Sequence, residues 1–199
     1  LLVEDSVRYY STYLPELYRM VLRQSAEFLK ETLNEQQRKH MKRSRPKILL
    51  ATNLDDAMAM YEKYKSNLLG VISDVGFCEH RGGKPEEEKL DAGIELVRHI
   101  KADDPKMPIL LQSSQDCISA VAEELGVGFL RKYSKTLMIQ LYEYIKEEFA
   151  FGDFIFRDAD RVEYGRAANL KELEILMREV PEDILLANTS KNMLSKWFM

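Results

Sequence analysis

Acidic residues closely follow two of the apolar runs in the sequence. Glu4 and Asp5 come directly after the run at 1–3, and Asp74 closely follows a second run at 68–72. Three carboxylates that meet in one crevice repel one another, so they need a cation. Hard carboxylate oxygens suit Mg²⁺, which takes a few protein ligands and keeps several waters. The residue types therefore predict a Mg²⁺ site formed by these three acids.

A hydroxyl group and an ammonium group follow two later apolar runs. Ser113 comes shortly after 109–111, and Lys132 comes after 129–130. Beside Mg²⁺, these groups would supply donors for the oxygens of an incoming phosphoryl group. Asp74 would then be the nucleophile, as in aspartyl-phosphate chemistry. Taken singly, such residues are more often helix caps, loop charges or surface cations, but their joint order along the chain favours the functional interpretation.

The elements that must position these residues alternate between strand and helix. Continuous apolar runs indicate strands buried on both faces, as in a parallel sheet covered by helices. Five such strands are expected, each followed by a helix, at 1–3, 48–51, 68–72, 109–111 and 129–132. Right-handed crossovers then give a doubly wound α/β domain over residues 1–149, in which ligands bind beyond the carboxyl ends of the strands.

The first helix is expected to be unusually long. Apolar residues recur at helical spacing from Leu14 to Thr32, and Pro46 ends the pattern. The basic stretch 38–47 is interpreted as a solvated helix end, because cations complement the helix dipole there. The next helix is predicted to begin with Asn53 or Asp55 as its N-cap.

Composition excludes several classes of protein. The 199 residues include 29 Lys and Arg against 33 Asp and Glu, a net charge of −4, which does not suggest a nucleic-acid partner. The longest apolar runs fall far short of the ~20 residues that a membrane span requires. Two cysteines, Cys78 and Cys117, are too few for a disulfide framework and favour a reducing cytoplasm.

These motifs resemble the receiver domains of the response regulators of bacterial two-component systems. The resemblance covers residues 1–149 and rests on the segments LLVEDS, GVISDVGF, DAGIELVRHI, MPILLQSS and GVGFLRK. It implies a flavodoxin-like sheet of order 2-1-3-4-5, with Mg²⁺ as cofactor and Asp74 as phosphoacceptor. Glu4 and Asp5 would bind the metal together with Asp74, and Gly76 would add its backbone carbonyl.

The same resemblance implies a conformational switch. Ser113 would be the switch hydroxyl, Phe129 the switch aromatic, and Lys132 the lysine that binds the phosphoryl group. A histidine kinase or a small-molecule phosphodonor would supply the phosphoryl group, and an attached or separate effector module would receive the signal. A homodimer is a further option, whereas no membrane or nucleic-acid partner is expected.

The sequence departs from the family pattern in places. Cys78 stands where the family often has Pro, and Tyr133 replaces the Pro that usually follows the lysine. The first helix is overlong, and the polar loop over 78–90 is enlarged. We therefore expect an output face of altered shape.

The segment from residue 150 onward follows another pattern. Two short runs, 153–157 and 161–165, flank Asp158-Ala159-Asp160 and predict a β-hairpin. One helix is expected from Leu170 to Val180. A second, opened by Thr189 or Ser190, is expected to present an apolar patch consisting of Leu194, Trp197 and Phe198.

Residues 165–197 resemble the segment that links a receiver-like domain to the PEP/pyruvate-binding domain in bacterial phosphoenolpyruvate-synthase-like proteins. The resemblance implies an appendage over 150–199 that leads to a catalytic or effector module beyond Met199. In the chain as given, the apolar patch of the last helix is expected to be buried by self-association or by folding back on the hairpin.

The sequence thus predicts a regulatory phosphoacceptor domain rather than an enzyme. One alternative is a pseudo-receiver that is not phosphorylated and serves as an interaction domain of a phosphoenolpyruvate-synthase-like enzyme. Another is a small hydrolase that uses Asp74 as a turnover nucleophile. The sequence offers no second catalytic acid near Asp74, which argues against the hydrolase.

Overall fold

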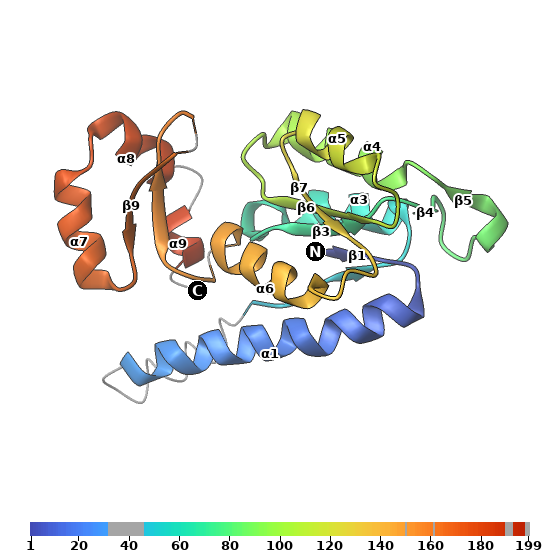
Figure 1. Cartoon of the computed structure of the whole chain (residues 1–199), viewed down its shortest axis with the longest axis horizontal. Helices are drawn as coiled ribbons and strands as arrows, with labels where there is room; N and C mark the ends of the chain where they lie inside the picture. Colours follow the sequence, from blue (N-terminus) through green and yellow to red (C-terminus); the bar gives the residue numbers. More distant parts are fainter. Residues whose placement is uncertain (32–45, 150, 161, 190–192, 198–199) are drawn as a thin grey trace. The chain divides into compact units, whose positions relative to one another are not determined.

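The computed structural model describes residues 1–31, 46–149, 151–160, 162–189 and 193–197 (Figure 1). The chain divides into two compact units, Leu1–Tyr142 and Glu143–Met199. Across the described segments, no helix has the length and apolar character needed to cross a bilayer.

The first unit is formed around a five-stranded parallel sheet. Its strands are β1 (Leu2–Val3), β2 (Leu50–Ala51), β3 (Val71–Asp74), β6 (Ile109–Ser113) and β7 (Gly128–Arg131). They are arranged in the order β2-β1-β3-β6-β7, and every neighbouring pair is parallel. Counted over the parallel strands, this is the order 2-1-3-4-5, so the predicted doubly wound, flavodoxin-like sheet is confirmed.

Helices connect these strands. They are α1 (Val7–Glu31), α3 (Leu54–Tyr64) with the 3₁₀ turn η1 (Lys65–Asn67), α4 (Ala92–Asp103), α5 (Ile118–Glu124) and α6 (Leu137–Glu148). Asn53, not Asp55, caps α3: its side-chain oxygen accepts a hydrogen bond of 2.8 Å from the backbone N–H of Asp56. Most of the basic stretch expected at the end of the first helix lies in 32–45, outside the described residues.

Both faces of the sheet are buried, as the continuous apolar strands predict. Val71 and Leu111 pack with residues of α3, α4 and α5 in one hydrophobic core. Their chain neighbours Ile72 and Leu110 point to the opposite face, since side chains alternate along a strand, and they are equally buried. Figure 1 shows α1 running along one side of the sheet with α4 and α5 on the other.

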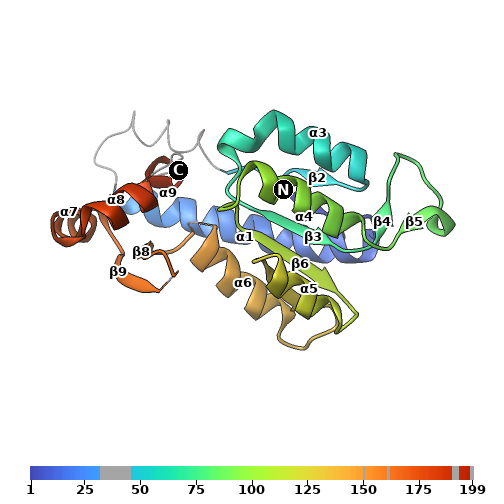
Figure 2. The ribbon, with the colours of Figure 1, turned by 90° about the horizontal axis from the view of Figure 1, so that it is seen from above.

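The polar region after Asp74 is more ordered than a loop. It contains β4 (Phe77–Cys78), the 3₁₀ turn η2 (Pro85–Glu87) and β5 (Glu88–Lys89), and β4 and β5 pair antiparallel. Figure 2 shows this excursion projecting away from the end of the sheet. The short strands were not predicted because the stretch is mostly polar, but the fully buried Phe77 anchors them to the core.

The second unit contains the predicted hairpin. Strands β8 (Phe154–Arg157) and β9 (Glu163–Ala167) pair antiparallel, and α7 (Leu170–Glu179), α8 (Glu182–Thr189) and α9 (Met193–Trp197) follow. Of the two residues expected to open the last helix, Thr189 does not, and Ser190 lies outside the described residues. Thr189 ends α8, where its hydroxyl donates a hydrogen bond to the carbonyl of Leu185, a pattern that Ser and Thr also adopt inside helices.

The last helix folds back on the hairpin. Trp197 is buried, its ring meets that of Phe154 edge-on at a centroid distance of 5.8 Å, and its indole N–H donates to the carbonyl of Gly152 at 2.7 Å. This is one of the two outcomes expected for the apolar patch. Phe198 lies outside the described residues.

Candidate functional site

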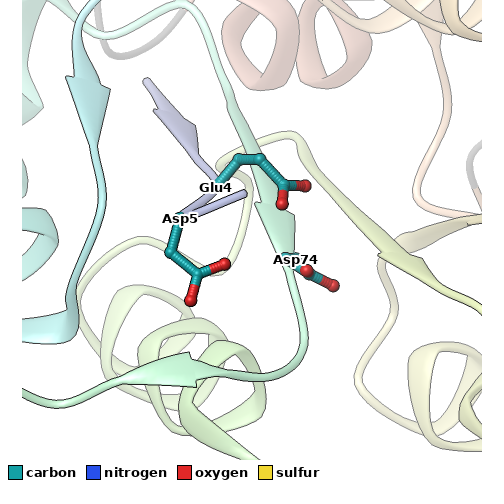
Figure 3. Close-up of side chains that lie close together, drawn as sticks. All are labelled: Glu4, Asp5 and Asp74. Atoms are coloured by element: carbon teal, nitrogen blue, oxygen red, sulfur yellow. The ribbon is translucent and has the colours of Figure 1, made fainter. Parts of the chain in front are cut away.

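Three acidic side chains converge at the carboxyl ends of β1 and β3. Each of Glu4, Asp5 and Asp74 offers a carboxylate oxygen, and these oxygens all lie within 4.8 Å of one another (Figure 3). The two strands are parallel neighbours with Val3 opposite Ser73, so the residues that follow each strand meet at one edge. Parallel pairing thus brings together acids that are far apart in the sequence.

The electrostatics of this acidic cluster favour a bound cation. Burial, together with the charge of Asp74, raises the pKa of Glu4 to about 7 against the opposing effect of Lys132. The pKa of Asp5 is likewise raised, by burial and by the charge of Asp74. The donors are all carboxylate oxygens, which is the ligand type that Mg²⁺ prefers. The residues present therefore fit that ion.

Lys132 reaches into this cluster from the end of β7. Its ammonium group donates to Glu4 at 2.9 Å and also to Asp74, and the lysine side chain is only 7% exposed. The backbone N–H of Lys132 donates to the carbonyl of Ser113 at 2.9 Å, which continues the β6–β7 pairing beyond the strand. Burial opposes the lysine's charge, but Asp74 and Glu4 raise its pKa above the ordinary value. The ammonium therefore remains charged.

Ser113 and Phe129 lie on the strands beside these groups. Ser113 is buried at the end of β6, one strand from Asp74, and its hydroxyl oxygen accepts a hydrogen bond of 3.1 Å from the backbone N–H of Gln115. Phe129 of β7 lies opposite Leu111 and packs, partly buried, against the core beneath α3, α4 and α5. The two predicted switch residues thus lie on neighbouring strands.

A fourth carboxylate approaches the site from the β4–β5 pair. An oxygen of Glu88 lies 2.5 Å from the point that a Cβ on Gly76 would occupy. Burial and the charges of Asp5 and Asp74 raise the pKa of Glu88. The sequence offers no sign of a second catalytic acid near Asp74, and Glu88 is a nearby carboxylate that its local pattern does not single out. Glu88 is one of several glutamates in a polar stretch, and only the antiparallel pairing shows which of them faces the site.

An aromatic side chain that the sequence did not indicate lies next to Lys132. The ring of Tyr9, in the first turn of α1, lies over the ammonium of Lys132 at 4.3 Å from the ring centroid. No local pattern in the sequence relates Tyr9 to Lys132, because the two residues belong to elements that are far apart along the chain.

Comparison with known proteins gives a similarity to solved structures but no matching family. No family model matches the chain, and none of the curated proteins matches it. Among solved structures, the chain is similar to a response regulator receiver protein from Sinorhizobium medicae, with a TM-score of 0.48 and 15% sequence identity. The match covers 74% of this chain and 90% of that one. The assignment of function below therefore rests on the geometry of the site itself.

Proposed function

We propose that the first unit is a phosphoacceptor domain that takes a phosphoryl group on Asp74 and acts as the receiver in phosphorelay signalling. The observation that carries the proposal is the shared position of three carboxylates and a buried ammonium at the carboxyl ends of β1, β3 and β7. A flavodoxin-like sheet places ligands at this edge, where the strand order reverses between β1 and β3.

In the proposed reaction, a carboxylate oxygen of Asp74 attacks the phosphorus of a histidine-kinase phosphohistidine or a small phosphodonor. The new oxygen–phosphorus bond forms as the bond to the leaving group breaks, and the leaving group departs with the electron pair. Lys132 already contacts Asp74, so its ammonium would shift onto a phosphoryl oxygen and neutralise its charge. The hydroxyl of Ser113 would donate a hydrogen bond to a second phosphoryl oxygen.

Glu4, Asp5 and Asp74, with the backbone carbonyl of Gly76, would hold Mg²⁺. The ion supplies charge neutralisation for the phosphoryl oxygens in such reactions. Movement of Ser113 toward the phosphoryl group, followed by Phe129, would then carry the signal to an effector module. Two packings that differ by a few kcal/mol suffice for such a switch.

The kind of protein to which this domain belongs is proposed from the resemblance of residues 165–197 to the linking segment of phosphoenolpyruvate-synthase-like proteins. In that context the chain would be the regulatory part of a bacterial, cytoplasmic, phosphoenolpyruvate-synthase-like protein, with 150–199 as the segment that leads to the enzymatic module. Glu88 gives the hydrolase alternative a specific basis, because a carboxylate beside Gly76 is a candidate base for water attack on the phosphoaspartate.

Incubation with acetyl phosphate and Mg²⁺, followed by intact-mass analysis, tests the proposal. A stable adduct with the mass of one phosphoryl group is expected in the wild type and in Asp91→Asn, whose exposed side chain lies outside the acidic cluster. An Asp74→Asn variant should give none. Continuous release of phosphate without an adduct would support the hydrolase, and neither adduct nor release would support the pseudo-receiver.

A further inference from the structure

The ammonium of Lys132 has a partner that the proposed phosphoryl chemistry does not include. An ammonium group has three N–H donors, and among the described residues Glu4 and Asp74 are the two acceptors that its side chain meets. The side chain is 7% exposed, so water has little access to the remaining donor. The ring of Tyr9 lies over the nitrogen at 4.3 Å, well inside the ~6 Å range of a cation–π interaction.

Other tyrosines hold the ring of Tyr9 in place. On one side Tyr13, one helical turn further along α1 and almost fully buried, stacks with it at a centroid distance of 6.2 Å and an interplanar angle of 23°. Tyr133, the residue after the lysine, meets it edge-on at 5.9 Å and 69°. The Tyr9 ring is therefore fixed by its neighbours before any ligand arrives.

The backbone of Tyr133 supplies an independent observation. Tyr133 has a φ of +69°, and among the described residues it is the one non-glycine residue with a positive φ. The left-handed conformation is unfavourable for a bulky residue and persists where the surroundings require it. Tyr133 is 68% exposed, so burial of its own side chain does not compensate that cost. In this conformation the Tyr133 ring makes its edge-on contact with the ring of Tyr9.

We propose that Tyr9 is a positioning residue whose ring holds the Lys132 ammonium between Glu4 and Asp74, with Tyr133 closing the outer edge of the ring. The proposal rests on the proposed function, because it assigns Tyr9 to the lysine that would receive the phosphoryl group. An aromatic face attracts the cation without adding a further negative charge to a cluster in which charge repulsion already raises the pKa of the acids. The ammonium is thus kept in place while remaining free to shift its hydrogen bonds to a phosphoryl oxygen.

Two measurements on the same set of variants test this role. The set is Tyr9→Phe and Tyr9→Trp, which keep an aromatic face, Tyr9→Leu, which removes it, and Tyr10→Leu as the matched control from the same helical turn. The first measurement is the NMR shift of the Lys132 side-chain protons in metal-free, unphosphorylated protein labelled at lysine, assigned with Lys132→Arg. The second is the affinity for beryllofluoride, a phosphoryl mimic, in the presence of Mg²⁺.

We expect an upfield ring-current shift of the Lys132 protons in the wild type, in both aromatic variants and in Tyr10→Leu, and its loss in Tyr9→Leu. Beryllofluoride should bind roughly tenfold more weakly to Tyr9→Leu, which lies between the effects of an exposed and a fully desolvated cation–π interaction, and within about twofold of the wild type to Tyr9→Phe. A merely structural role would not give rescue by aromatic residues together with loss of the shift.

An unchanged Lys132 shift and unchanged beryllofluoride affinity in Tyr9→Leu would overturn the proposal. So would equal losses in Tyr9→Leu and Tyr9→Phe, because the aromatic face would then be irrelevant. A wild type that does not bind beryllofluoride but shows the Tyr9-dependent shift would overturn the phosphoacceptor function and still support Tyr9 as the residue that positions Lys132.

Discussion

The ammonium of Lys132 and the carboxylate of Glu4 lie 2.9 Å apart, although 128 residues separate them in the sequence. Glu4 follows β1 and Lys132 follows β7, two strands that are not neighbours in the sheet. Both side chains are nearly inaccessible to water. Their ion pair therefore bridges the carboxyl ends of the intervening strands, and Lys132 also pairs with Asp74, the residue on which the proposed chemistry depends.

Asp74 and Asp5 are expected to respond differently to removal of charge. Asp74→Asn should abolish both phosphorylation and beryllofluoride binding, because only this residue bonds to phosphorus in the proposed reaction. Asp5→Asn should mainly weaken Mg²⁺, by roughly tenfold or more, since it removes one of three carboxylate ligands. Isothermal titration with Mg²⁺ and with beryllofluoride separates the two effects. Phosphorylation of Asp74→Asn at the wild-type rate would refute the site assignment.

The raised pKa of Glu4 predicts a loss of stability with rising pH in metal-free protein. The carboxyl has a pKa of about 7 in the folded state against 4.5 in its ordinary environment, so the folded state holds the proton more tightly. Its stabilising contribution is complete below pH 4.5 and is lost as the pH rises through 7. The shift corresponds to about 3 kcal/mol of unfolding free energy.

Urea unfolding of the wild type and of Glu4→Gln at several pH values checks this prediction. Subtracting the two profiles isolates Glu4 from the other titrating groups, and the difference should move in favour of the variant by up to about 3 kcal/mol between pH 4 and pH 8. Mg²⁺ should stabilise the wild type at pH 8 more than the variant. Parallel profiles would show that Glu4 titrates normally in the folded protein.

Gly93 is expected to be required for the position of Asp74. A Cβ at Gly93 would collide with the carbonyl oxygen of Asp74 and come within 2.9 Å of the Cα of Val75. We expect Gly93→Ala to lower the unfolding free energy by about 1–3 kcal/mol and to weaken beryllofluoride binding, because the end of β3 must move.

The control for this variant is Gly126→Ala. Gly126 has a φ of +64° and open space around it, so the substitution strains the backbone without reaching the site. It should cost about 1 kcal/mol and leave beryllofluoride affinity unchanged. Equal losses of affinity in the two variants would attribute the Gly93 effect to general destabilisation.

Two buried amides are expected to give opposite results. Among the residues that the structure describes, neither the amide oxygen nor the amide nitrogen of Gln112 has a hydrogen-bond partner, and both are buried. Unpaired buried polar groups cost free energy. Gln112→Met keeps the volume and should raise the unfolding free energy by about 1 kcal/mol or more. Gln112 lies opposite Asp74, so beryllofluoride affinity serves as the check that the site is intact.

The contrasting amide is Asn188 in the second unit. It accepts a hydrogen bond from the backbone N–H of Arg157 at 3.1 Å and donates to the carbonyls of Arg157 and Ile184 at 2.6 and 2.7 Å. Asn188→Ala should destabilise that unit by about 1–3 kcal/mol, because it removes the side-chain partner of these partly buried backbone groups. Chemical denaturation of both variants decides the matter, and stabilisation by Asn188→Ala would contradict the assigned hydrogen bonds.

Much of the fold could be predicted from the sequence because its signals are local. A continuous apolar run specifies a strand buried on both faces, and strand–helix alternation restricts the chain to a parallel, doubly wound sheet. The carboxyl ends of parallel strands share one edge, so Glu4, Asp74 and Lys132 could be predicted to lie near one another. Local signals also left alternatives open, as at the N-cap of α3, where Asn53 and Asp55 are similarly favoured as caps and only the backbone geometry selects Asn53.

Tertiary structure decided the contacts that depend on side chains meeting across elements without a periodic pattern. Glu88 approaches Gly76 only because β4 and β5 pair within a polar stretch that has no strand signature. Tyr9 covers Lys132 because the first turn of α1 and the residues after β7 lie at the same edge of the sheet. The two residues are distant in the sequence, so only packing brings them together. Hydrophobic periodicity reports which face of an element is buried, whereas the identity of the neighbour on that face is settled only when the elements pack.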